Sequence, residues 1–230
     1  MKPETLRVAE VGLEAITEVA LPVAGPAHVT PFVGGNVIVA VGSPQGSESD
    51  VPDESAFEST FYVVDLSARA ARKIGGPYLA VSPDLRHVVR KTDGTTVVLE
   101  DTETKRLVQL AKGAREYVTQ FMFSPDNKRL AYLALDGDRN DVFMLLYRPV
   151  DESVIVGARL IVRLTDGVGE PVDVIRGGYS VQSAWNIDRW TSPTVLEYVQ
   201  SEFAGRTYEF DAGTSDKGAV KKGLIDWERI

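Results

Sequence analysis

The chain has 230 residues, of which 43% are hydrophobic and 25% charged, a composition typical of a globular protein. It contains no cysteine, which excludes a disulfide framework, thiolate metal sites and a cysteine nucleophile. The formal net charge of −8 at pH 7 argues against nucleic acid as a partner, because an acidic surface repels phosphate backbones.

The sequence as given carries no segment that predicts insertion into a membrane or export. No apolar run reaches the length that spans a bilayer, so we expect no membrane span. The start, Met1-Lys-Pro-Glu-Thr-Leu-Arg7, lacks the apolar core of a secretory signal. These features predict a cytoplasmic protein, with a trimmed exported protein or a virion component as the open alternative.

The first twenty residues carry apolar side chains at spacings that fit a short helix or one or two strands. We expect at least one strand near Leu13–Leu21. Pro22, Gly25 and Pro26 then interrupt regular structure.

A first unit occupies residues 29–76, and its short apolar runs are rich in β-branched and aromatic residues, as in strands. The segment Gly42–Ser59 holds five acidic residues among Ser, Pro and Gly, so we interpret it as a solvated, mobile loop. The expected strands begin at Val29 and cover Asn36–Val41, Thr60–Leu66 and Arg72–Ile74.

Three further units of the same kind follow, at residues 77–112, 117–167 and 179–226. The second has expected strands at Tyr78–Val81, Arg86–Arg90, Thr95–Glu100 and Arg106–Leu110, with a hairpin turn at Asp93-Gly94. The third has Val118–Phe123, Lys128–Leu135, Val142–Tyr147 and Ala158–Leu164, with a turn at Asp166-Gly167 and insertions near residues 150–157 and 168–178. The fourth has Val181–Trp185, Thr194–Gln200, Arg206–Phe210 and Ala219–Ile225.

The units recur with a measurable period. Pro31, Pro83 and Pro125 lie at like positions, 52 and then 42 residues apart, and Asn186 would be the next. Four strands per unit at such spacings predict the blades of a β-propeller, and a β-sandwich built from the same hairpins is the alternative. We therefore expect a single all-β domain over residues 1–230 with about four readable four-stranded antiparallel blades.

Two features resemble the TolB-like branch of the WD-repeat-like β-propellers. One is the turn Ser-Pro-Asp, at Ser82 and again at Ser124, each followed by an apolar strand, and the other is the hairpin at residues 97–107. The resemblance is good over Tyr78–Leu135, weaker over Val29–Ile74 and only topological over Val181–Ile225. It implies a ring of blades that binds partners through loops on one face.

A ring of blades must join its first and last members, or apolar faces and sheet edges stay open. Residues 1–28 are left over as a closing strand or arm, so we expect the segment Leu13–Leu21 to pack beside Thr207–Phe210 or Ala219–Ile225. Docking of this segment onto a partner chain is the alternative. Deletion of residues 1–22 tests both: an isolated monomer should lose stability if the segment closes the ring, whereas a stable monomer that no longer assembles would indicate docking.

Candidate catalytic and metal-binding groups are sparse. Only His28 and His87 are present, and no Gly-x-Ser-x-Gly motif occurs, so we expect no Ser-His-Asp site and interpret His87 as a packed strand residue. Asp136, Asp138 and Asn140 begin like a calcium loop, but Asp141 stands where that loop needs glycine, so a plain hairpin loop is the preferred interpretation. Gly34-Gly35 and Gly177-Gly178 are interpreted as turns, and we expect no cofactor.

Tyr179, Arg189 and Trp190 form the candidate partner-binding set. They cluster around the irregular start of the fourth unit, and Trp, Tyr and Arg dominate interaction hot spots. Arg189 and Trp190 are expected in a surface loop, whereas Trp185 is expected between blades. The sequence thus favours a non-catalytic protein-interaction module. The alternatives are a structural subunit of an oligomer or larger assembly, and a ligand-binding or catalytic central channel.

Overall fold

The computed structural model describes the residues that form the strands and most of their short connections. The described residues are 5–9, 16–20, 27–30, 36–42, 59–65, 67–76, 78–93, 96–111, 115–138, 141–142, 155–180, 183–202, 206–211 and 221–224. The chain divides into two compact units, Met1–Lys91 and Thr92–Ile230, and each is described by itself.

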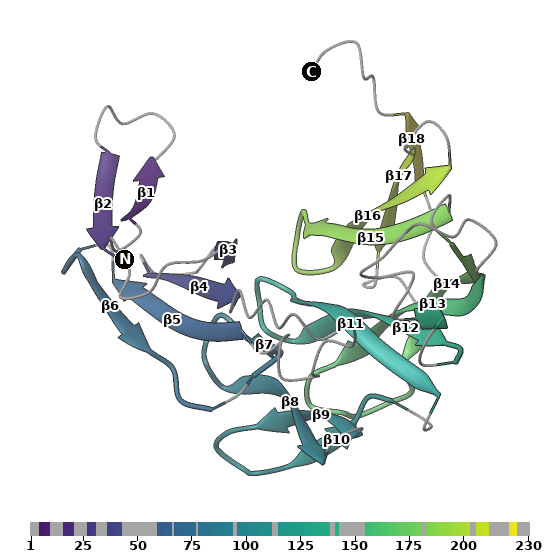
Figure 1. Ribbon diagram of the computed structural model, residues 1–230, viewed down its shortest axis with the longest axis horizontal. Coiled ribbons are helices and arrows are strands. Elements are labelled where there is room, and N and C mark those ends of the chain that lie inside the picture. The colour runs from purple at the N-terminus through teal and green to yellow at the C-terminus, as the bar shows by residue number, and fades with distance from the viewer. Residues whose placement is uncertain are drawn as a thin grey trace. The chain divides into compact units, whose positions relative to one another are not determined.

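Four antiparallel sheets of four strands follow one another along the chain, each within one stretch of the colour gradient in Figure 1. The first contains β3 (Ala27–Thr30), β4 (Asn36–Gly42), β5 (Ser59–Asp65) and β6 (Ala70–Lys73). The second contains β7 (Ala80–Val81), β8 (His87–Asp93), β9 (Thr96–Asp101) and β10 (Leu107–Gln109). The third contains β11 (Glu116–Phe123), β12 (Arg129–Asp136), β13 (Val156–Leu164) and β14 (Val172–Tyr179). The fourth contains β15 (Ser183–Trp190), β16 (Val195–Glu202), β17 (Arg206–Asp211) and β18 (Lys221–Leu224).

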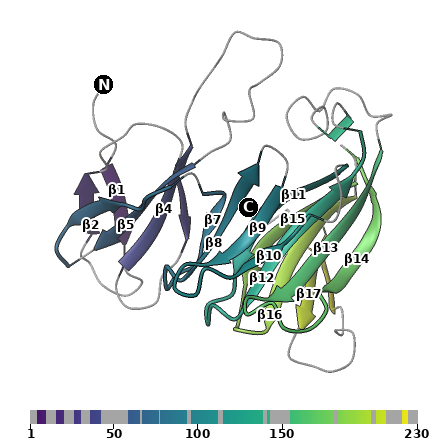
Figure 2. The same cartoon turned by 90° about the horizontal axis from the view of Figure 1, so that it is seen from below.

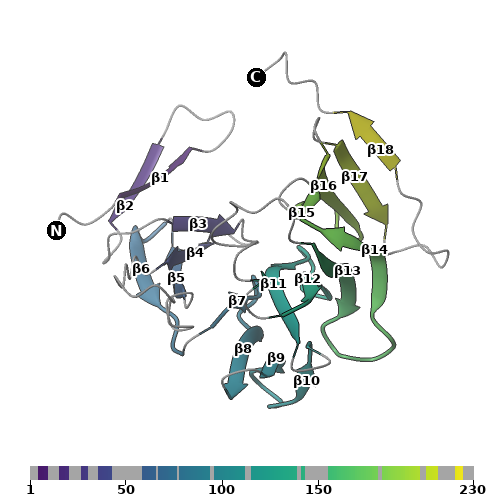
Figure 3. The same cartoon turned by 45° about the vertical axis from the view of Figure 1, so that its right-hand side comes forward.

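Within each sheet the spatial order of the strands is their order in the sequence, as Figure 3 shows for β15 to β18. Neighbouring strands are therefore joined as hairpins and no described strand changes sheet, which is the arrangement of propeller blades. The prediction of an all-β chain with four four-stranded propeller blades is confirmed. Among the described residues, no helix is long and apolar enough to cross a membrane.

The third sheet differs from its prediction in its second half. The expected strand Val142–Tyr147 is wrong at its start, because Asp141 and Val142 form a helical turn in which the Val142 N–H donates to the Asp138 carbonyl, 3.0 Å away. The expected insertion at residues 168–178 is also wrong over most of its length, because β14 occupies residues 172–178. Gly177 and Gly178 lie inside β14, where a Cβ on Gly177 would come within 3.2 Å of the Trp185 ring. Gly177 thus makes room for an aromatic side chain, and the two glycines belong to a strand instead of a turn.

The Ser-Pro-Asp turns of the second and third sheets share one hydrogen-bond pattern. Ser82 Oγ donates to Asp84 Oδ1 at 2.6 Å and accepts the His87 N–H at 2.8 Å. Ser124 Oγ likewise donates to Asp126 Oδ1 at 2.6 Å and accepts the Arg129 N–H at 2.9 Å. Each serine is fully buried, so the turn satisfies polar groups that burial would otherwise penalise. The repeated sequence therefore forms the same hydrogen bonds in both sheets.

The fourth sheet has a Ser-Pro turn at Ser192-Pro193 with a different hydrogen-bond pattern. Ser192 Oγ accepts the N–H groups of Thr194 (3.2 Å) and Val195 (3.1 Å), which turns the chain from β15 into β16. Asn186, the expected like position, lies instead inside β15 opposite Val199. The error arose because the turn has Thr194 where the other two have aspartate, so the pattern Ser-Pro-Asp fails by one residue.

Acidification should report on the third-sheet turn. Burial acts to raise the pKa of Asp126, but hydrogen bonds from Ser124 and the Lys128 N–H and the charges of Arg129 and Lys128 outweigh it, so the pKa lies below its ordinary value. A group whose pKa is lowered on folding stabilises the fold above its unfolded-state pKa, and this contribution disappears as the pH falls through the folded-state pKa. Asp126→Asn should therefore lower the Tm at neutral pH. Between about pH 5 and pH 2 the Tm of this variant should decrease less than the Tm of the wild type. Thermal unfolding followed by circular dichroism measures both effects. Parallel acid limbs in the two proteins would contradict this role.

The N-terminal residues form a two-stranded sheet of their own. β1 (Thr5–Ala9) pairs antiparallel with β2 (Ile16–Ala20), with Leu6 opposite Val19. The expected strand near Leu13–Leu21 is confirmed over Ile16–Ala20, and β1 is an additional strand that the ambiguous spacing had left open. Packing of this segment beside the C-terminal sheet stays a prediction.

The acidic loop at residues 43–58 lies outside the described residues, but its two ends are fixed. Gly42, the last residue of β4, pairs with Ser59, the first of β5, so the loop connects the two strands of a hairpin. Replacing residues 43–58 with a short Gly-Ser turn should leave the Tm within a few degrees, because each doubling of loop length costs only ~0.6 kcal/mol. Loss of folding in that variant would mean that the segment packs against the sheets.

Candidate interaction surface on strands β11 and β15

β11 and β15 are the first strands of the third and fourth sheets, and they contact each other in the second unit (Figure 2). Among the described strands, each is hydrogen-bonded to one neighbouring strand. Seven of the eight residues of β11 are half-buried and only Phe123 is buried. The third sheet therefore presents a partly apolar, half-buried first strand next to an edge of the fourth.

Below this surface, the two sheets pack through aliphatic and aromatic side chains. The buried cluster contains residues from β12, β13 and β16, with half-buried side chains of β14 and β15 packed against it. Its buried members are Ala131, Leu160, Val162, Leu196 and Tyr198. This cluster holds the two sheets together. It therefore restricts the positions of the polar groups near it.

A bulge in β11 directs Gln120 towards β15. The register slips between Thr119 and Met122, so that Gln120 and Phe121 together face one residue of β12. Gln120 has φ 53°, a left-handed conformation that residues other than glycine rarely adopt. The slip also explains why Phe121, which a regular strand would bury between blades, is half-buried and stacks on Tyr132 at 6.4 Å between ring centroids.

The Gln120 side chain bonds to three successive residues of β15. Its Nε2 donates to the Trp185 carbonyl at 3.2 Å and to Asn186 Oδ1 at 3.0 Å. Its Oε1 accepts the Ile187 N–H at 3.0 Å. The carboxamide therefore satisfies one carbonyl and one N–H on the edge of β15, as a peptide group of an added strand would do.

Two further hydrogen bonds cross the same boundary. The Trp190 indole Nε1 donates to the Met122 carbonyl on β11 at 3.2 Å, and the Trp190 ring packs against the buried cluster. Arg129 Nη1 on β12 donates to the Pro193 carbonyl at 3.1 Å. The Trp190 ring thus packs on the buried cluster while its indole N–H bonds to β11, and the side chain remains half-buried.

Arg189 is the exposed cation of β15, with 67% of its side chain accessible. Its Nε donates to Glu197 Oε2 on the paired strand at 2.7 Å. This hydrogen bond, with the charges of Glu197 and Asp188, raises the pKa of Arg189. Asn186 and Asp188 on the same strand are also exposed, so β15 presents charged and amide groups beside the half-buried Trp190.

The structure brings two of the three predicted partner-binding residues together. Arg189 and Trp190 are adjacent on β15, which is a strand and not the expected loop, because the bulge between Ile187 and Arg189 lets the pairing with β16 continue through them. Tyr179 lies elsewhere. It ends β14 and is 6% exposed in a cluster that also contains Trp185.

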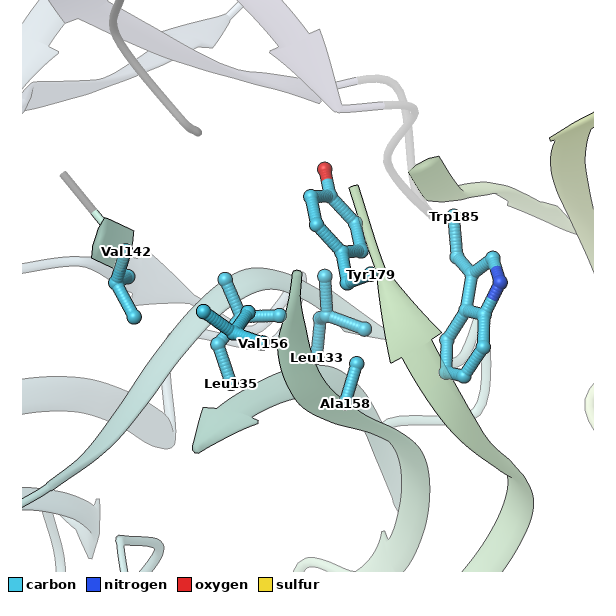
Figure 4. Close-up of a cluster of buried hydrophobic side chains, with 7 residues drawn as sticks. All are labelled: Leu133, Leu135, Val142, Val156, Ala158, Tyr179 and Trp185. Carbon is cyan, nitrogen blue, oxygen red and sulfur yellow. The ribbon is translucent and has the colours of Figure 1, made fainter. Parts of the chain in front are cut away.

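Figure 4 shows this second cluster, in which the Tyr179 hydroxyl points away from the aliphatic side chains. Burial raises the pKa of Tyr179. Trp185 is 3% exposed, as expected for a residue between blades, and its Nε1 has no hydrogen-bond partner among the described residues. We therefore assign Tyr179 to the core and keep Arg189 and Trp190 as surface candidates.

The described residues among the calcium candidates Asp136, Asp138 and Asn140 are not arranged as metal ligands. Asp136 ends β12 opposite Glu116, and Asp138 uses its carbonyl to accept the Val142 N–H, while Asn140 lies outside the described residues. In the part of the chain that the structure describes, no three acidic or histidine side chains are placed to hold a metal ion. His87 is buried in β8, in agreement with the packed interpretation.

Sequence reasoning missed Gln120, which connects the two sheets. The only available signal was a polar residue in the apolar run Val118-Thr-Gln-Phe-Met-Phe123. Strand alternation already explains such a residue as solvent-facing, so it indicates no special role. The bulge that redirects its side chain leaves no composition signal, because the left-handed position carries glutamine instead of glycine.

Comparison with known proteins gives fold-level matches only. No family model and no curated protein matches the sequence. Among solved structures, the chain is similar to a Pyrococcus horikoshii acylaminoacyl peptidase (12% identity, TM-score 0.44, 85% of this chain and 32% of that chain). It is also similar to Kuenenia stuttgartiensis hydrazine synthase (15%, 0.44, 96% and 60%) and to a chain of a nidogen/laminin complex (13%, 0.45, 84% and 62%). The chain thus spans about a third of the first of these proteins and less than two thirds of the others.

Proposed function

We propose that the chain is a non-catalytic protein-interaction module built on β-propeller blades, and that a protein partner binds on strands β11 and β15. The observation that supports this most is the half-buried first strand of the third sheet beside the exposed Arg189 and half-buried Trp190. Arginine and tryptophan are among the residues that carry most binding energy in protein interfaces. The same proposal places the chain in the TolB-like branch of the WD-repeat-like propellers, supported by the shared chemistry of its Ser-Pro-Asp turns.

Affinity capture from cells of the source organism tests the proposal with a matched pair of variants. Arg189→Glu reverses a charge that is 67% exposed and paired with Glu197, and Arg176→Glu reverses one that is 68% exposed and paired with Asp173. We expect Arg189→Glu to lose the proteins that the wild type retains, and Arg176→Glu to keep them. Equal retention by both variants, or capture of no protein by the wild type, would contradict the proposal.

A structural subunit of a larger assembly, such as an envelope complex or a virion, is the second candidate. It is favoured by the small number of readable blades and by the long acidic loop between β4 and β5. Native mass spectrometry separates the two candidates, since a monomer with exchangeable partners is expected of a module and a defined oligomer or obligate complex of a subunit. A ligand-binding or catalytic central channel is the third candidate.

A further inference from the structure

The Gln120 carboxamide and the edge of β15 form a contact that is both strained and specific. Gln120 holds a left-handed φ of 53° at a bulge position where glycine is the ordinary residue. That conformation persists only where the surroundings over-determine it. Here the surroundings are the three hydrogen bonds to Trp185, Asn186 and Ile187, all on one strand of the neighbouring sheet.

We propose that Gln120 is a latch between the third and fourth sheets. In the closed state the carboxamide covers the Trp185 carbonyl and the Ile187 N–H on the edge of β15. In the open state Gln120 leaves the left-handed region, and these two backbone groups are released to solvent on the strand edge. The strain of the closed state favours opening and the three hydrogen bonds oppose it, so their balance sets how often the latch opens.

The other cross-sheet contacts indicate how far the opening extends. Trp190 Nε1 donates to the Met122 carbonyl, two residues after Gln120, so the same movement of β11 would release this indole N–H. The pairing of β12 with β13 is continuous from Arg129 to Asp136 and involves neither β11 nor β15, so it should stay closed. The latch does not rest on the proposed function.

Hydrogen exchange followed by NMR on the full chain tests the latch through Gln120→Asn. Asparagine keeps the amide and tolerates the left-handed conformation, but it is one methylene shorter and cannot reach β15. We expect exchange of the Ile187 N–H and the Trp190 indole N–H to accelerate together by roughly tenfold or more, with backbone amides of β12 and β13 unchanged. Unchanged exchange at Ile187 would overturn the proposal, as would equal acceleration throughout the third sheet, because that would mean global destabilisation.

Gln120→Glu supplies an independent measurement with a reversible readout. An ionised carboxylate cannot donate to the Trp185 carbonyl or to Asn186 Oδ1, whereas a protonated carboxyl can donate one hydrogen bond and still accept the Ile187 N–H. At about pH 7.5 this variant should show the open pattern of exchange, and at about pH 4 it should approach the wild type after correction for the intrinsic pH dependence of exchange. If the ratio of the exchange rates of the variant and the wild type is the same at both pH values, the latch is overturned.

Discussion

Replacing Phe123 with alanine is expected to lower the free energy of unfolding by roughly 3–5 kcal/mol, the usual cost of truncating a buried aromatic side chain. Phe123 ends β11 opposite Leu130 and is 6% exposed, so its removal leaves a cavity that the paired strands cannot close. A loss of this size is a large part of the roughly 5–15 kcal/mol that stabilises a typical domain. Urea denaturation followed by circular dichroism measures it.

Phe121 provides the matched control, two residues away on the same strand. Phe121 is half-buried, and its described ring contact is the stack on Tyr132. Phe121→Ala should therefore lower the free energy of unfolding by roughly 1 kcal/mol for the lost stacking. The loss of its partial burial should add a smaller amount. The two variants should therefore differ clearly in urea midpoint. Equal midpoints would mean that the bulge does not separate the environments of the two rings.

Replacing Arg159 with alanine is the second change with a large expected effect. Arg159 lies on β13 opposite Ala134, and this small side chain lets the guanidinium cross β12 to the Glu116 carboxylate on β11. Its other nitrogen lies 3.5 Å from Asp173 Oδ1, and Asp173 in turn pairs with Arg176. The Glu116 side chain is 8% exposed, so loss of Arg159 removes the cation from a largely buried carboxylate.

The expected destabilisation is roughly 3 kcal/mol, at the lower end of the range for removing one member of a buried ion pair because Arg159 itself is 20% exposed. A double-mutant cycle with Glu116→Gln supplies the control, since Glu116→Gln removes the carboxylate with which Arg159 pairs. We expect the double variant to be more stable than Arg159→Ala alone. Additive losses in urea unfolding would contradict a coupled pair.

Much of the architecture could be predicted because local signals and the fold agree. Apolar runs of strand length, the Ser-Pro-Asp turns and Asp93-Gly94 mark hairpins directly, and the hairpins in chain order make the sheets. The failures occur where the tertiary structure decides. Val142 is apolar because a helical turn packs it against Leu135 and Val156, and Gly177 is a glycine because the Trp185 ring lies over it. Neither reason is present in the local sequence.

The candidate site was only partly predictable for the same kind of reason. Residue type alone drew attention to Arg189 and Trp190, and both do lie on an accessible strand. Residue type also selected Tyr179, which the neighbouring sheet buries. Gln120 was missed, since its role depends on a bulge, a left-handed backbone and the edge of a strand about 65 residues later in the chain.

Photo-crosslinking from β15 in cells of the source organism tests the central claim most directly. A photoreactive residue at Asp188, which is exposed on β15 beside Arg189, is compared with one at Glu170, which is exposed in the turn before β14. The account expects a discrete adduct of this chain with a partner protein from position 188 and none from position 170. No adduct from position 188, or the same adducts from both positions, would contradict a partner-binding surface on β11 and β15.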